Sequence, residues 1–187
     1  MNFSLSASDR AALIATAREA VSSRLEKRPP RWPTTGPELD ASCGAFVTLR
    51  SRSGPFSDLR GCIGRMIASE SLVETVRAMA VAAAFEDPRF PPVEKGEYSD
   101  LVFEITALSP MRRIEDADEI EVGRHGVYMT KGWHSAVFLP QVAIEQGWNR
   151  DTMLEHLCAK AGLPRDAWRE PDALFQVFEG LVIEEGD

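Results

Sequence analysis

The sequence predicts an α+β fold in which a mixed or antiparallel sheet is flanked by helices. Segments with strand periodicity and segments with helical periodicity follow one another without the regular alternation of a parallel βαβ array. No internal repeat of solenoid length is present. Because 187 residues are enough to bury a proper core, we expect residues 1–187 to form one domain, either as a single body or as two intimately joined lobes.

The first element that we expect is an amphipathic helix from Ser8 to Leu25, with Ser6 or Ser8 as its N-cap. Apolar residues recur there at three- and four-residue spacing and fall on one face, namely Leu13, Ile14, Ala17, Val21 and Leu25. The four prolines and one glycine between Arg28 and Pro37 cannot continue a helix, so they predict an extended loop.

Two strands and a second helix come next. Gly44–Ser51 has strand character, Ser53-Gly54-Pro55 indicates a turn, and Leu59–Ile67 is expected to return as a strand interrupted by two glycines. Ser69–Ala84 carries a helical apolar stripe, for which Ser69 can serve as the N-cap. The helix should stop at Asp87-Pro88, because proline disfavours a helical conformation in the residue before it.

The second half of the chain shows the same mixture. Leu101–Leu108 is the clearest strand, because polar and apolar residues alternate along it. Further on, the sequence predicts a hairpin that turns at Lys131-Gly132 and a short helix closed by Gly147. A further helix is expected to begin at Thr152, with Glu155 completing a capping box, and to end at Gly162. The last predicted element is a strand over Phe175–Ile183.

Composition limits the classes of function. No segment approaches the roughly 18 consecutive apolar residues that a membrane span needs, and the first residues lack the pattern of a secretory signal. The formal net charge is −8, whereas a general nucleic-acid binder needs the opposite sign to neutralise phosphates. Three cysteines without tight spacing are typical of a reducing compartment, so we expect a cytoplasmic protein.

The cysteines and histidines predict neither a metal site nor a cofactor. The three histidines are His125, His134 and His156, and none of them belongs to a zinc-binding pattern. The spacings typical of phosphate-binding and dinucleotide-binding loops are also missing from the sequence.

The motif LRGCIGR, Leu59–Arg65, is the first candidate site. Gly61 and Gly64 permit positive φ and the close approach of a backbone or a ligand, so the motif can form a turn whose N–H groups bind an anion. Arg60 and Arg65 can add a fork for a carboxylate or a phosphate. The other interpretation is a tight turn around a buried thiol, since free cysteines are often buried.

Two further motifs supply candidate residues. In FEDPRFPPV, Asp87 and Arg89 bracket a proline and can pair with each other or cap neighbouring groups, although a surface pair stabilises little. His125 follows a glycine and an arginine and can act as a general base, or can simply be a solvated turn histidine. The candidate catalytic residues are therefore Cys62 and His125, and the candidate binding residues are Arg60, Gly61, Ile63, Gly64, Asp87 and Arg89.

Taken together, these segments resemble the AMMECR domain family, and in particular its microbial members called AmmeMemoRadiSam system protein A. The matching segments occur in the order typical of the family and span about Leu13 to Phe178, namely GAFVTL, LRGCIGR, AAAFEDPRFPPV, EITALSP, HGV, FLPQVA and CAKAGLP with Trp168. The LRGCIG segment is the family's signature motif.

The resemblance implies a structure and a set of partners. It implies an α+β protein with a larger lobe from both chain ends, a smaller inserted lobe, and a cleft between the two lobes. It also implies that a Memo-like protein and a radical S-adenosylmethionine protein belong to the same system. The resemblance does not imply a reaction.

Three functions are compatible with these observations. The first is an accessory or substrate-binding component, in which case any radical chemistry belongs to the partner. The second is an enzyme that uses Cys62 as its nucleophile, which needs a positive neighbourhood and a base such as His125 or His134. The third is an RNA-binding module that uses arginines of the cleft. Whether the protein is an enzyme is left open by the sequence.

Overall fold

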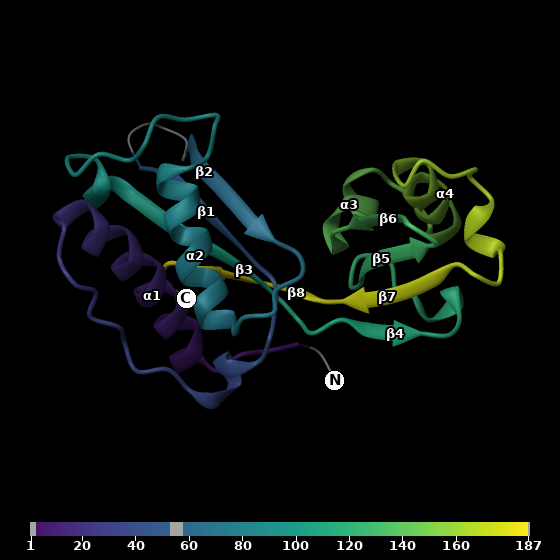
Figure 1. Cartoon of the computed structure of the whole chain (residues 1–187), viewed down its shortest axis with the longest axis horizontal. Coiled ribbons are helices and arrows are strands. Elements are labelled where there is room, and N and C mark those ends of the chain that lie inside the picture. The colour runs from purple at the N-terminus through teal and green to yellow at the C-terminus, as the bar shows by residue number, and fades with distance from the viewer. Residues whose placement is uncertain (1–2, 53–57, 187) are drawn as a thin grey trace. The chain divides into compact units, whose positions relative to one another are not determined.

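The computed structural model of this α+β protein describes residues 3–52 and 58–186. It has four α-helices and two antiparallel four-stranded sheets among these residues (Figure 1). The chain divides into two compact units. The terminal unit comprises Phe3–Leu108 and residues 181–186, so it combines the first and the last parts of the described chain, and the inserted unit comprises Ser109–Gly180. The turn predicted at Ser53-Gly54-Pro55 lies outside the described residues.

The terminal unit is a sheet in the order β2-β1-β3-β8, with α1 and α2 packed on one face (Figure 1). Its elements are α1 (Ala7–Glu26), β1 (Ala45–Ser51), β2 (Asp58–Arg65), α2 (Leu72–Phe85), β3 (Leu101–Leu108), β8 (Gly180–Glu184) and the short 3₁₀ turns Pro37–Asp40 and Tyr98–Asp100.

The core of the terminal unit lies between the two helices and the sheet. Strand residues Val47, Leu49, Phe103 and Ile105 are fully buried against the apolar faces of α1 and α2. The helices are rich in alanine on this side, which lets their backbones approach the sheet closely. Within the described residues of this unit, the other face of the sheet carries no helix, which decides where the candidate site residues lie.

The inserted unit is a second sheet in the order β4-β7-β5-β6, with its core formed against α4 and the residues around it (Figure 1). Its elements are β4 (Arg112–Ile114), β5 (Gly126–Lys131), β6 (His134–Phe138), α3 (Pro140–Glu145), α4 (Arg150–Lys160), β7 (Leu174–Phe178) and the short 3₁₀ turns Ala117–Glu119 and Ala167–Arg169.

Most predicted elements are present, but two N-caps are wrong. Ser71, not Ser69, caps α2, and it forms a capping box with Glu74. Asn149 caps α4 by accepting a hydrogen bond from the Thr152 N–H, so α4 begins before the predicted Thr152. Several residues near each helix start have capping chemistry, and only the three-dimensional path of the chain selects one of them.

The predicted last strand over Phe175–Ile183 is also wrong as a single element. It is two strands that belong to different sheets: β7 pairs with β4 and β5, and β8 lies beside β3. The hairpin turn is shifted by one residue, to Gly132 and Trp133, with Gly132 at a φ of 58°. In both places the apolar pattern predicted the extended conformation correctly. The division into β7 and β8 depends on pairing with distant strands, whereas the turn is placed by the pairing of Lys131 with His134.

No helix of the described chain is long and apolar enough to cross a membrane.

Candidate functional site

The LRGCIGR motif forms strand β2 and not a loop. Cys62 stands opposite Thr48 of β1, and Ile63 stands opposite Val47, which is part of the core. Because side chains alternate along a strand, Ile63 faces α1 and α2, and Cys62 faces the opposite side of the sheet. The Cys62 side chain is half-buried there. Ile63 is thus positioned for packing and not for binding.

The two glycines of the motif serve close contacts. Neither adopts a positive φ, so the expected turn does not form. A Cβ atom on Gly61 would lie 2.2 Å from the backbone oxygen of Ala83 in α2, and one on Gly64 would lie 2.0 Å from the ring of Phe46. Glycine is needed at both positions because a helix backbone and an aromatic ring approach the strand directly.

The backbone of Cys62 is held by the FEDPRFPPV segment. Strand β2 is an edge of its sheet, so its outer backbone groups have no neighbouring strand. The Asp87 carboxylate accepts the Cys62 N–H, with 2.9 Å from N to Oδ2, and the Arg89 guanidinium donates to the Cys62 carbonyl oxygen at 3.1 Å. We call these contacts the Asp87–Arg89 clamp. The N–H group that was expected to bind an external anion therefore already holds a carboxylate of the chain.

Asp87 is not a surface partner of Arg89, contrary to the expectation of a weak surface pair. Its side chain is buried, with 4% of the residue exposed. The Arg89 guanidinium donates to both carboxylate oxygens, at 3.0 and 2.7 Å. These bonds are the main reason why the pKa of Asp87 lies well below its usual range. The hydrogen bonds from the backbone N–H groups of Cys62 and Arg89 lower it further. Asp87 is thus an anchored anion that does not exchange protons near neutral pH.

Arg60 is engaged elsewhere along the same edge. Leu49 of β1 pairs with Gly61, and the next residue of β1, Arg50, pairs with Leu59. Arg60 therefore has no partner in β1 and is the extra residue of a β-bulge. Its guanidinium makes two hydrogen bonds to Glu97, both of 2.9 Å, and its side chain is 13% exposed. The Arg60 bond is the main cause of the lowered pKa of Glu97. One of the two arginines of the expected anion-binding fork is therefore used inside the protein.

His125 belongs to the inserted unit, directly before β5. Its ring is buried, its Nδ1 accepts the Glu121 N–H at 3.1 Å, and burial lowers its pKa. The other two histidines lie in the same unit, so the terminal unit, which carries Cys62, contains no histidine. The pairing of Cys62 with His125 or His134 stays a prediction.

The strand register brings four further side chains to the same face as Cys62, namely Phe46, Thr48, Arg50 and Glu104, and none of them was a candidate site residue. Thr48 lies between Cys62 of β2 and Glu104 of β3, and its hydroxyl donates to the Cys62 sulfur at 3.3 Å. Arg50 pairs with Glu104 at 3.6 Å. We call Phe46, Thr48, Arg50, Cys62 and Glu104 the Cys62 face. The alternation of polar and apolar residues in Leu101–Leu108 predicts that Glu104 points away from the core. Only the strand register shows which side chains of β1 and β2 lie beside it.

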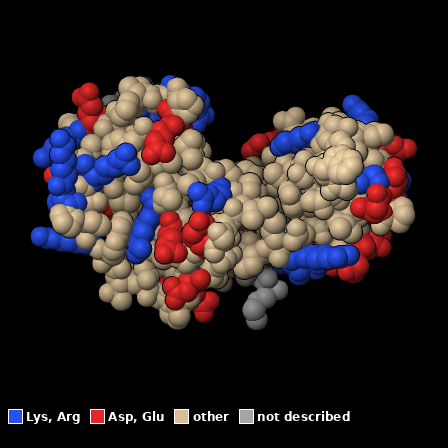
Figure 2. Space-filling model, in the orientation of Figure 1, with Lys and Arg blue, Asp and Glu red and all other residues tan. Residues whose placement is uncertain are grey.

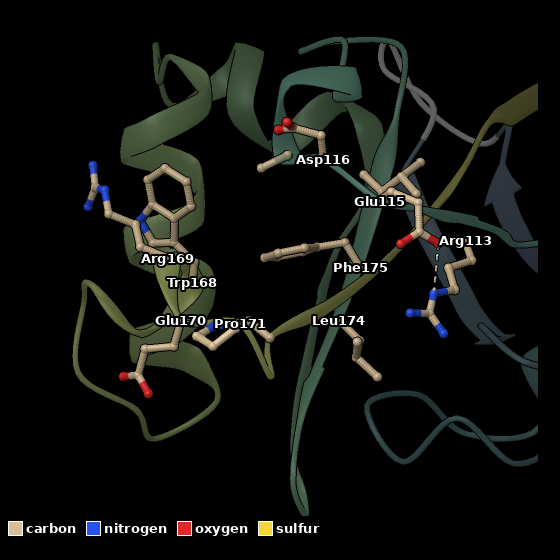
Figure 3. A pocket seen from close by; sticks show the side chains of 12 residues that line it. Arg113, Glu115, Asp116, Trp168, Arg169, Glu170, Pro171, Leu174 and Phe175 are labelled. Atoms are coloured by element: carbon tan, nitrogen blue, oxygen red, sulfur yellow. Dashed lines mark ion pairs between the residues drawn. The ribbon is translucent and has the colours of Figure 1, made fainter.

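A hollow of about 400 Å³ lies in the inserted unit, and none of the predicted site residues lines it (Figure 3). Trp168 and Phe175 lie on opposite sides of it, and Arg113 and Glu115 form an ion pair at its edge (Figure 3). Among the described residues, no three His, Cys, Asp or Glu side chains gather in a way that could hold a metal ion.

Comparison with known proteins places the chain in a family. The AMMECR1 family model matches residues 14–183. Protein NEQ441 of Nanoarchaeum equitans is 38% identical over 180 residues, which cover 92% of this chain and 98% of that protein. Protein PH0010 of Pyrococcus horikoshii is 40% identical over 183 residues, which cover 92% of this chain and 88% of that protein. The crystal structure of uncharacterized protein PH0010 superposes with a TM-score of 0.70 at 38% identity, covering 93% of this chain and 90% of that one. The chain belongs to the AMMECR1 family.

Proposed function

We propose that this AMMECR1-family protein is an accessory component that binds a substrate or a partner through the Cys62 face. In this proposal it acts together with a Memo-like protein and a radical S-adenosylmethionine protein, the partners that its resemblance to the microbial members implies. The observation that carries the proposal is the Asp87–Arg89 clamp, because the charged groups nearest to Cys62 hold the backbone of β2 in place.

The surroundings of Cys62 suit binding better than proton transfer. Asp87 is an anchored anion, Arg60 is paired with Glu97, and the terminal unit contains no histidine. A nucleophilic thiol normally needs an adjacent base or a free positive charge. By contrast, the hydroxyl of Thr48 and the ion pair of Arg50 with Glu104 give the Cys62 face donors and acceptors that are fixed on rigid strands.

The test measures the affinity of the purified chain for each of the two partners by titration calorimetry. The informative variant is the charge swap Arg50→Glu with Glu104→Lys, which keeps an ion pair but reverses its orientation towards a ligand. We expect the swap to weaken binding of at least one partner by about tenfold or more. The matched control is the charge swap Arg24→Glu with Glu86→Arg. These two residues form an exposed ion pair at the ends of α1 and α2 in the same unit, with 3.9 Å between the charged atoms.

Two results would contradict this proposal. If neither partner binds the wild-type chain, the accessory role is wrong. If the charge swap leaves the affinity unchanged while the melting temperature shows a folded protein, the Cys62 face is not the contact surface. Gly61→Val is unsuitable as a test of binding, because its side chain would collide with the backbone of α2.

A second candidate function is catalysis by Cys62, and one contact favours it. The Thr48 hydroxyl donates to the Cys62 sulfur at 3.3 Å, and this contact holds the thiol in one orientation, which a nucleophile needs. Cys62→Ser changes the shape little and distinguishes the two functions in an assay with both partners present. If Cys62→Ser binds the partners normally but forms no product, the catalytic role gains support. If product formation is retained, the thiol has no chemical role.

RNA binding, the third function considered, gains no support from the charge distribution. The net charge is −8, and Figure 2 shows Lys and Arg side chains interleaved with Asp and Glu over the face in view. Phosphate backbones are bound by surfaces of one sign, which this face does not present.

A further inference from the structure

A second hollow lies on the helix side of the terminal unit, on the opposite side of the sheet from Cys62. Its volume is about 470 Å³, within the range of roughly 300–1,000 Å³ that is usual for small-molecule sites. Most of its lining is apolar and comes from α1, α2 and the proline-rich segment after α1, with Ala20, Pro30, Trp32, Met79 and Val81 among the residues. The sequence predicted only an extended loop for this proline-rich segment.

Trp32 and Arg77 give this hollow a specific chemistry. The Arg77 guanidinium lies over the indole ring of Trp32, with 4.1 Å from Cζ to the ring centroid. Trp32 keeps 41% of its surface exposed, so part of the ring is free to contact a ligand. The pair therefore presents a flat apolar surface and a positive charge side by side. We call this site the Trp32–Arg77 hollow.

Three charged residues line the hollow, namely Arg65, Arg77 and Glu86, and among the described residues no neighbour neutralises the charge of Arg77. Arg65 pairs with Glu70 at 3.0 Å, and Glu86 pairs with Arg24 at 3.9 Å. Arg77 makes no ion pair within the described part of the chain, and its Nε is buried there without a hydrogen-bond partner. The Arg77 side chain is only partly buried and lines the hollow, so an anion there can meet a guanidinium that no carboxylate neutralises.

The hollow of Figure 3 provides a useful comparison. There too an arginine stacks on a tryptophan, with Arg169 Cζ at 4.0 Å from the Trp168 ring. Arg169, however, lies 3.4 Å from the Asp151 carboxylate, and Arg113 pairs with Glu115 (Figure 3). The two hollows thus share an arginine stacked on an indole, but among the residues that the structure describes, only Arg77 of these two stacked arginines has no acidic partner.

We propose that the Trp32–Arg77 hollow binds an aromatic carboxylate. The carboxylate meets the Arg77 guanidinium, and the aromatic body contacts Trp32 and the apolar side chains of α2. An aromatic ring is favoured because it can pack on the exposed part of the indole. A free small acid and the C-terminal residue of a peptide offer the same chemistry. This site is independent of the Cys62 face and of the function proposed for it.

The experiment follows the indole N–H resonances of nitrogen-labelled protein during titration with naphthoate. The four tryptophans report separately, at positions 32, 133, 148 and 168. We expect a saturable shift of the Trp32 signal, assigned from Trp32→Phe, while the Trp168 signal stays in place. Naphthamide, the uncharged analogue, should bind at least about tenfold more weakly, because it lacks the charge-assisted hydrogen bonds.

Acetylated phenylalanine as a second titrant tests whether the ligand is the end of a peptide. Binding comparable to that of naphthoate indicates a peptide C-terminus, and much weaker binding indicates a free acid.

Matched variants complete the test. Arg77→Gln should weaken naphthoate binding by about tenfold or more, whereas Arg169→Gln, which removes the other stacked arginine, should leave it unchanged. The melting temperature of each variant checks that it is folded. The proposal is overturned if naphthamide binds as well as naphthoate, if Arg77→Gln binds normally, or if the Trp168 signal shifts in place of that of Trp32.

Discussion

At the scale of single residues, the FEDPRFPPV and LRGCIGR motifs form one structural device. Asp87 and Arg89 take the place of a neighbouring strand at Cys62, and Gly61 lets α2 lie against the same strand. A motif that resembles a reactive loop in the sequence is therefore built largely to hold an edge strand. What it leaves available for function is the side chain of Cys62 and the residues beside it on the Cys62 face.

The first prediction concerns Asp87 and pH. We expect Asp87→Asn to lower the free energy of unfolding at pH 7 by about 2 kcal/mol, since hydrogen bonds to a charged group are lost. Because the pKa of Asp87 is lowered on folding, its contribution is complete above the unfolded-state value of about 3.9 and is lost as the pH falls below it. Denaturant titrations should therefore show the wild-type and variant curves converging between about pH 5 and pH 2. A constant difference over that range would contradict this explanation.

The second prediction concerns Gly61. Gly61→Ala should destabilise the protein by about 1–3 kcal/mol, because the added Cβ collides with the backbone oxygen of Ala83 and the helix must move. Gly96→Ala is the matched control, since nothing lies within 4 Å of its added Cβ. Chemical denaturation of both variants measures the difference. Equal stability of the two variants would show that α2 does not constrain β2 at this position.

At the scale of elements, the helix ends depend on single side chains. Ser71 accepts the Glu74 N–H and Glu74 reaches back to the Ser71 backbone, so the start of α2 is fixed next to the strand that carries Cys62. Ser69, two residues earlier, has the same capping chemistry in the sequence but lies outside the helix.

The third prediction compares these two serines. Ser71→Ala should lower the free energy of unfolding by about 1 kcal/mol, because the capping box is lost. Ser69→Ala should change it by less than about 0.5 kcal/mol, as is usual for a surface position. Thermal unfolding of both variants under the same conditions measures the difference. A larger effect at Ser69 would mean that α2 begins earlier than the structure shows.

At the scale of the whole molecule, the first and the last parts of the described chain belong to the same unit, the terminal unit. Arg18 of α1 binds Glu185 and the backbone oxygen of Leu101, and Ile183 of β8 is buried in the core. Strand β8 therefore completes a core that is otherwise formed by described residues between Phe3 and Leu108, and the inserted unit interrupts this unit in the sequence.

The fourth prediction is that truncation after Gly180 destabilises the terminal unit cooperatively. The loss of the Ile183 side chain alone should cost about 2–5 kcal/mol, and each kcal/mol corresponds to about 2–4 °C for a chain of this size. We therefore expect the melting temperature to fall by roughly 10 °C or more. A melting temperature equal to that of the full chain would show that β8 does not contribute to this core.

The sequence by itself determined the local structure of this protein. The periodicity of residues 8–25 predicted α1, the alternation of Leu101–Leu108 predicted β3, and Gly147 and Gly162 marked helix ends at positive φ. These features depend on neighbouring residues and on the conformational preferences of each residue type.

Only the tertiary structure decided which distant groups meet. The carboxylate of Asp87 binds the backbone of Cys62 across 25 positions, Arg60 binds Glu97 across 37, and residues 175–183 divide between two sheets. The physical reason is that strand pairing and edge contacts are set by register and by packing over long distances. A shift of one residue would exchange the two faces of β2 and place Ile63, in place of Cys62, beside Thr48.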